Sequence, residues 1–162
     1  MITVNPLPKS KTEEKLENLL KANNEHVSIG HFSESGTHYS GFTYPELMML
    51  HHNGTNHIPP RPVLEFLFHN RPKILANPAV NKAVKRYMDS KMTQKDLTAM
   101  LKAVGQVIGE EEVDIFGSRM LTSNSRVTQE RKGENAPLVD TQDLVNETSY
   151  KDSVTKQRRR VL

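Results

Sequence analysis

Cysteine and tryptophan are absent from this sequence of 162 residues, and apolar residues are scarce. Without cysteine the chain has no disulfide, no thiolate metal ligand and no cysteine nucleophile. Apolar residues make up 35% of the chain and aromatic residues 6%, which is lean for a soluble domain. Either part of the chain lies outside the core, or neighbouring subunits supply some of the burial.

Long apolar runs are also missing. No uncharged apolar stretch approaches the roughly 20 residues that span a bilayer, so we expect no membrane partner. A glycine-rich phosphate loop and the Gly-x-Ser-x-Gly elbow of serine hydrolases are absent as well. We therefore predict no catalytic residue and no cofactor, and we interpret the protein as one that is not an enzyme.

Positive charge is concentrated late in the sequence. Residues 1–118 hold 13 Lys and Arg against 13 Asp and Glu, whereas residues 119–162 hold 9 against 6, which accounts for the net charge of +3. We predict a basic C-terminal tail at residues 156–162. Its Arg158, Arg159 and Arg160 are candidates for contacts with DNA or a partner, although a short basic terminus is more often only solubilising.

Helix start signals recur along the chain and predict a helix-dominated α+β fold with a small sheet. Three sites have capping-box spacing, and an Asn-Pro pair supplies a fourth start. The predicted helices cover residues 10–23, 44–52, 63–68, 78–88 and 94–116. Gly105 and Gly109 weaken the last and longest helix, and they would allow a neighbouring element to approach it closely.

Strand signals are fewer than helix signals. Residues 27–32 alternate in polarity as a strand does, and residues 148–155 are a candidate last strand. Apolar residues nearly vanish at 121–136, where burial cannot offset the entropy of ordering the chain. We predict an extended polar loop there, within a single domain of residues 1–155.

An acidic run closes the predicted long helix. Glu110, Glu111, Glu112 and Asp114 lie near its C-terminal end, where the helix dipole disfavours negative charge. We interpret this run as a solvated helix face.

All seven histidines fall between residues 26 and 69, and such clustering suggests a metal site. The spacing argues against one, because His-Glu-x-x-His is absent and the adjacent His51 and His52 would point about 100° apart on a helix. We therefore predict no metal site. His52-Asn53 with His57 also evokes the His-Asn-His nucleases, so a small metal-dependent, histidine-using nuclease is the alternative function.

Two separated segments together resemble the bacteriophage tail-completion (neck, head–tail joining) family, which includes relatives of minor tail protein Z and of the virion-morphogenesis proteins of Mu-like phages. The first signature runs from the strand at 27–32 through the helix at 44–52 into Gly-Thr-Asn-His-Ile-Pro-Pro-Arg-Pro at 54–62. The second contains Thr128, Lys132 and Pro-Leu-Val-Asp-Thr at 137–141. The chain departs from the family pattern near His52, where glutamate is usual, and at Gln142, where glycine is usual.

This resemblance implies a structural virion protein of the phage neck, without catalysis. Such a protein forms a homo-oligomeric ring, commonly a hexamer, between the head-side connector or stopper protein and the tail terminator or tail tube. It would assemble in the host cytoplasm and contact the passing DNA non-specifically. The assembly candidates are the residues that match the signatures: Gly54, Thr55, Ile58, Pro59, Pro60, Arg61, Pro62, Lys132, Leu138, Asp140 and Thr141.

The proline-rich part of the first signature leaves two roles open for Arg61. Residues 59–62 form a stiff extended segment that presents the guanidinium as a pre-organised donor fork. That fork either pairs with a carboxylate of another subunit or caps a carbonyl within the chain. Asp140 and Thr141 likewise either join an interface or cap a helix at 142–146.

Overall fold

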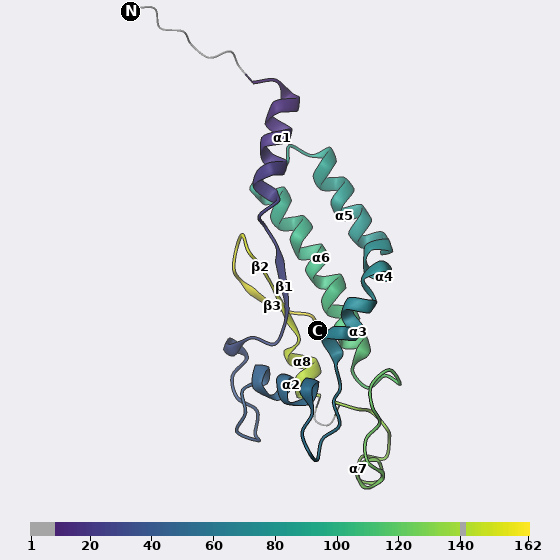
Figure 1. Cartoon of the computed structure of the whole chain (residues 1–162). Coiled ribbons are helices and arrows are strands. Elements are labelled where there is room, and N and C mark those ends of the chain that lie inside the picture. Colours follow the sequence, from purple (N-terminus) through teal and green to yellow (C-terminus); the bar gives the residue numbers. More distant parts are fainter. Residues whose placement is uncertain (1–8, 140–141) are drawn as a thin grey trace, which may run out of the picture.

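A computed structural model describes residues 9–139 and 142–162 and has an α+β architecture, as predicted (Figure 1). The helices are α1 (Lys11–Ala22), α2 (Tyr44–Asn53), α3 (Val63–His69), α4 (Arg71–Ala76), α5 (Pro78–Asp89), α6 (Gln94–Ile115), α7 (Arg126–Lys132) and α8 (Asp143–Glu147), with a short 3-10 turn at Ser33–Ser35. Strands β1 (Val27–Gly30), β2 (Ser149–Asp152) and β3 (Arg158–Arg160) form an antiparallel sheet in the order β1-β2-β3. None of the helices in the described part of the chain is long and apolar enough to cross a membrane.

The predicted helix starts are confirmed. At α1, α2 and α6 a serine or threonine side chain accepts from the third helical amide, and the acidic residue at that position accepts from the cap amide. Asn77 opens α5 by accepting from the amide of Ala79 at 2.8 Å. Helix α4 was not predicted. It begins without a side-chain cap, and a proline in its first turn is its only local start signal.

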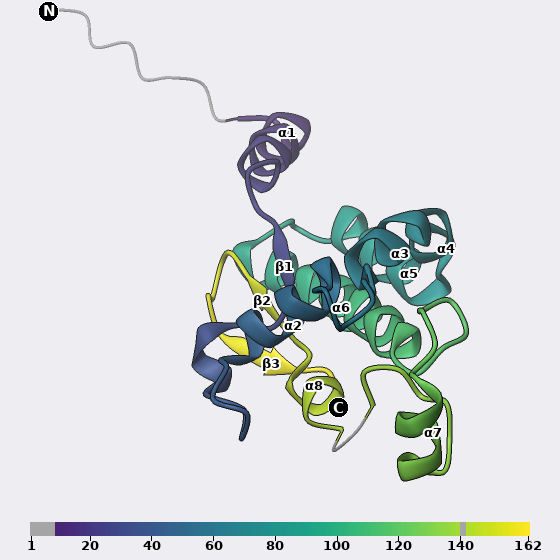
Figure 2. The ribbon, with the colours of Figure 1, turned by 60° about the horizontal axis from the view of Figure 1, so that its bottom comes forward.

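Helix α6 is the central element. It packs against α3, α4 and α5 on one side and against β1 and β2 on the other (Figure 2). Two glycines of α6 allow the sheet and the residue after it to pack closely against this helix. A Cβ placed on Gly105 would lie 2.5 Å from Cδ2 of Tyr150, and one placed on Gly109 would overlap Val161. The predicted close approach at Gly105 and Gly109 is therefore confirmed.

The main apolar core lies at the C-terminal end of α6. Val63 and Ile115 are fully buried there, among side chains from α2, α3, α8, the segment after α6 and Leu138 of the second signature. Smaller clusters cover the α5–α6 contact and the N-terminal half of α6. This core holds the two signature segments together.

The acidic run of α6 is not the solvated face that we predicted. Glu111 is 9% exposed and Glu112 is fully buried. Glu111 accepts hydrogen bonds from Asn70 Nδ2 and Lys73 Nζ, both at 2.8 Å, because α3 and α4 cover this side of α6. Glu110 and Asp114 do lie on the exposed side.

Residues 156–162 are not the basic tail that we predicted, because Arg158–Arg160 form β3. Arg160 pairs with Ser149, Arg159 with Tyr150 and Arg158 with Lys151 of β2 in antiparallel register. Arginine has no strong strand preference, so pairing with β2 and with acidic neighbours decides this conformation.

The polar segment at 121–136 leaves the body as an excursion, but it contains helix α7, which we did not predict (Figure 1). No residue of α7 is buried. Ser125 caps its first turn, and Gly133 ends it in the left-handed conformation. Hydrogen bonds from Asn124 N to Asn135 Oδ1 at 3.0 Å and from Asn135 Nδ2 to Ser123 Oγ at 3.1 Å close its base. Leu121 anchors the start of this segment in the main core, and polar contacts order the residues of the excursion beyond it.

Candidate functional site

The two signatures meet at one cleft of about 280 Å³, which we call the signature cleft. Its walls come from the chain after α2, from the start of the α7 excursion and from the segment before α8. Of the assembly candidates, five line it: Ile58, Pro59, Arg61, Lys132 and Leu138.

The first signature turns sharply at Gly54, which ends α2 with a φ of 72°. A Cβ on Gly54 would lie 2.7 Å from the backbone N of Pro60, so no side chain fits there. Thr55 holds the turn through its own amide, 2.8 Å from the carbonyl of Ile58, and through its hydroxyl, which accepts from the amide of Ile58 at 3.0 Å. The turn brings Pro59 and Pro60 back alongside the end of α2.

Arg61 caps carbonyl and amide oxygens within the chain, the second of its two predicted roles. Its Nε donates to the carbonyl of Thr122 and its Nη2 to Oδ1 of Asn124, each at 3.0 Å. Its backbone amide donates to the carbonyl of His51 at 2.8 Å. The side chain is 6% exposed, and burial lowers its pKa. Arg61 thus fastens the proline segment to the base of the α7 excursion.

Neighbouring groups add further contacts between the proline segment and the base of the α7 excursion. The hydroxyl of Thr122 donates to the carbonyl of Pro60 at 3.1 Å. Pro62 leads directly into α3, whose first residue Val63 is fully buried. The extended proline segment therefore links the body to the excursion.

Lys132 of the second signature also binds backbone oxygens. Its Nζ donates to the carbonyl of Ala136 at 2.8 Å and to that of Val139. The chain between them carries Leu138, which is buried in the main core at a φ of 64°. Lys132 therefore connects the end of α7 to the turn that follows it through these two hydrogen bonds. Asp140 and Thr141 lie outside the described residues.

Gln142, where the family has glycine, adopts the left-handed conformation at a φ of 63° and stands at the N-cap of α8. Only glycine enters this region without steric cost. The helix predicted at 142–146 is confirmed as α8.

Three of the seven histidines, His38, His51 and His57, line the signature cleft. Burial, with Arg61 and His38 nearby, lowers the pKa of His51 to about 4, so its ring is neutral at neutral pH. His38 Nε2 lies 3.5 Å from Oδ2 of Asp143. In the described ranges, no group of three or more His, Cys, Asp or Glu side chains is arranged to hold a metal ion.

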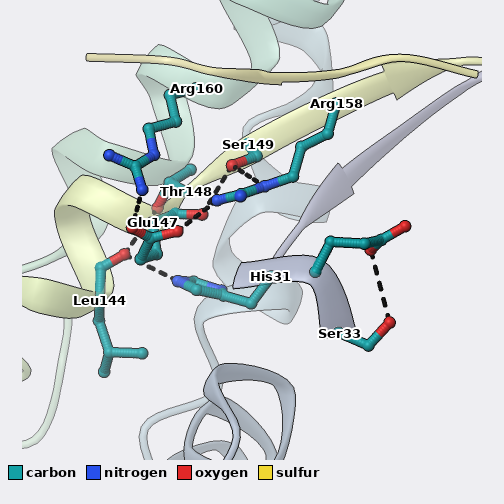
Figure 3. A network of polar contacts seen from close by, with 9 residues as sticks. His31, Ser33, Leu144, Glu147, Thr148, Ser149, Arg158 and Arg160 are labelled. Carbon is teal, nitrogen blue, oxygen red and sulfur yellow. Dashed lines mark hydrogen bonds and ion pairs between the residues drawn. The ribbon is translucent and has the colours of Figure 1, made fainter. Parts of the chain in front are cut away.

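None of the arginines of β3 lines the signature cleft. Arg158 and Arg160 point toward the carboxylate of Glu147 (Figure 3). Arg158 and Arg160 both donate to Glu147, and Arg158 Nε also donates to Ser149 Oγ at 3.0 Å. Arg159 Nη1 donates to Asp152 Oδ2 at 2.6 Å, and Asp152 is fully buried. The strand is thus an internal ion-pair cluster, and the predicted DNA contact has one well-exposed candidate, Arg160, whose side chain is 56% exposed.

The signature cleft combines fixed positive charge with neutral acceptors. Arg61 and Lys132 are bound by carbonyl and amide oxygens, so their charges are not cancelled by the hydrogen bonds that hold them. Among the lining residues Asp143 is the only acidic one. The chemistry of such a cleft suits an anionic group. Sequence patterns missed Asn124, because an asparagine in a polar loop carries no sign of the arginine that it binds.

No protein-family model, curated protein or solved structure matches this chain.

Proposed function

We propose that this protein is a structural subunit of a bacteriophage neck that assembles into a ring and joins the tail to the head connector. The proposal rests on the resemblance of two separated segments to the tail-completion family. The observation that carries it is that Arg61 of one signature and Lys132 of the other line a single cleft. Residues matched to one family by sequence alone thus form one site, as expected if they share a role.

The exposed apolar surface of α1 supports an assembly role. This helix has a complete capping box, yet it buries none of its residues. Leu16 is 57% exposed and Leu20 is 64% exposed, whereas the polar Lys15 and Asn18 reach the body through the carbonyls of Met88 and Lys91. The apolar stripe therefore faces away from its own chain, and Figures 1 and 2 show α1 projecting from the body.

A second copy of this chain is the occupant that we assign to the α1 stripe. A ring closes through heterologous contacts, in which one surface of each subunit meets a different surface of the next. Projecting helices with an unburied apolar stripe suit such contacts, and they supply the burial that the lean composition lacks. The head-side connector and the tail tube or terminator would then contact the two faces of the ring.

Electron microscopy of the purified protein, alone and mixed with candidate connector and tail-tube proteins, tests this function. We expect closed rings in at least one of these samples. The Leu20→Glu variant should lose the rings because it places a charge in the stripe, whereas Glu14→Gln, on the opposite side of α1, should keep them. Particles that remain single subunits in every mixture, or rings that survive Leu20→Glu unchanged, would argue against the proposal.

A further inference from the structure

A second pocket lies on the other side of α2 from the signature cleft. Its volume is about 360 Å³, and we call it the Glu112 pocket. Residues from β1, α2, α3 and α6 line it, among them His31, Met48, Met49, His52, Leu64 and Glu112. None of the assembly candidates lines it.

Glu112 is the most unusual group in this pocket. Its residue is fully buried, and neither of its carboxylate oxygens has a hydrogen-bond partner among the described residues. Burial alone raises the pKa of this carboxyl to about 7. A buried carboxyl without a partner is costly, and a group that could pair with it would recover that cost.

His31 adds a second acceptor to the pocket. Its Nε2 lies 2.8 Å from the carbonyl of Leu144, which can only accept, so Nε2 carries the proton (Figure 3). Burial lowers the pKa of His31, so the ring is neutral and its Nδ1 is an unprotonated hydrogen-bond acceptor. That Nδ1 is buried and has no partner in the described part of the chain. Glu112 and His31 therefore both lack a donor.

The mouth of the pocket is apolar. Met49 is 56% exposed and Leu64 is 45% exposed, and Met48 lies deeper in the same wall. An apolar entrance above unpaired acceptors is complementary to an aliphatic stem that ends in a cationic donor.

We propose that the Glu112 pocket binds an alkylammonium or alkylguanidinium group, whose N–H donors meet the Glu112 carboxylate and His31 Nδ1 while the stem packs on Met49 and Leu64. Two sources carry this chemistry, a lysine or arginine side chain of another protein and a free alkyl amine. The inference does not depend on the neck function, because none of the assembly candidates lines this pocket.

Methyl NMR of the methionines tests the proposal with n-butylguanidinium as the probe and n-butanol as its uncharged counterpart. We expect saturable shifts of the Met48 and Met49 methyl signals with the cation and much smaller ones with the alcohol. Glu112→Gln should weaken binding by about tenfold or more, because it removes a charge-assisted hydrogen bond. Glu110→Gln, an exposed change on the same helix, is the matched control.

The pH dependence gives an independent readout. Affinity for the cation should rise as pH rises through about 7, where the Glu112 carboxyl ionises. His31 and His52 are the other titratable side chains that line this pocket. A glycine-flanked arginine peptide distinguishes the sources, since only a pocket built for a protein side chain should admit it. Equal binding by Glu112→Gln, or no methyl shift at any probe concentration, would overturn the proposal.

Discussion

At the scale of single residues, buried polar groups distinguish this molecule from what its sequence suggests. Four acidic positions in one short run look alike in the sequence, but Glu112 is fully buried while Glu110 is exposed. Helical spacing alone cannot separate them, because burial depends on where α3 and α4 pack. The sequence could not decide between the two roles of Arg61 either, because its partners Thr122 and Asn124 lie about 60 residues further along the chain.

Glu112 makes stability depend on pH. Its carboxyl ionises near 4.5 when unfolded and at about 7 when folded, so the unfolded chain binds fewer protons between these values. Its contribution to the free energy of unfolding is therefore fully present below pH 4.5 and lost as pH rises through about 7. The full change is about 3 kcal/mol. Urea unfolding of the wild type and of Glu112→Gln across this range measures it as the difference between the two proteins.

The difference is needed because His51 acts in the opposite direction. Its pKa is lowered to about 4, so its contribution to stability rises with pH from there up to the ordinary value of 6.5. The two slopes offset each other in the wild type, whereas subtracting Glu112→Gln isolates the carboxyl. A difference that stays constant with pH would contradict the buried, unpartnered state of Glu112.

The left-handed backbone conformation of Gln142 has a steric cost that glycine would not have. With φ at 63°, Gln142→Gly should stabilise the protein by about 0.5–1 kcal/mol. Gln142→Ala removes the same side chain but keeps the steric cost, so it should bring no gain. Thermal unfolding of the three proteins compares them, and equal melting temperatures for the glycine and alanine variants would refute this explanation.

At the scale of elements, local signals predicted what is decided locally. The capping boxes at Ser10, Thr43 and Thr93 mark helix starts because the cap bonds form within four residues. By contrast, β3 depends on partners elsewhere in the chain. Three successive arginines show no strand pattern until Glu147 and Asp152 supply the opposite charges.

The contact between α6 and β2 requires glycine at position 105. Alanine is the better helix former by about 1 kcal/mol, yet its Cβ would overlap the Tyr150 ring. We expect Gly105→Ala to destabilise by about 1–3 kcal/mol in chemical unfolding. In a Tyr150→Ala background the same change should become neutral or stabilising, and an equal loss in both backgrounds would contradict the packing account.

Glu147 holds β3 to the body. It is buried and accepts from both Arg158 and Arg160, so Glu147→Gln should cost about 3 kcal/mol by leaving these cations without their charge partner. Glu130→Gln, which breaks only the exposed pair with Arg126, should cost less than about 0.5 kcal/mol. Hydrogen exchange of the β3 amides should quicken in the first variant alone. Equal effects of the two changes would mean that the terminal strand is held by its backbone pairing.

At the scale of the whole molecule, the α+β class was predictable but the site geometry was not. Helical periodicity and two strand-like segments are enough to predict a helix-dominated fold with a small sheet. Resemblance singled out Arg61 and Lys132, but it did not predict that both line one cleft, because they lie on opposite sides of α6 in the sequence. No sequence pattern predicted the Glu112 pocket, since the residues that line it come from four elements.

Solution mass by light scattering tests the central claim most directly, with the protein alone and then mixed with candidate connector and tail-tube proteins. The account predicts a closed oligomer, either for the protein alone or on mixing, because the apolar stripe of α1 at Leu16 and Leu20 is left unburied by its own chain. The Leu20→Glu variant should remain a monomer under the same conditions. A wild-type protein that stays monomeric with every partner would contradict a ring-forming neck subunit.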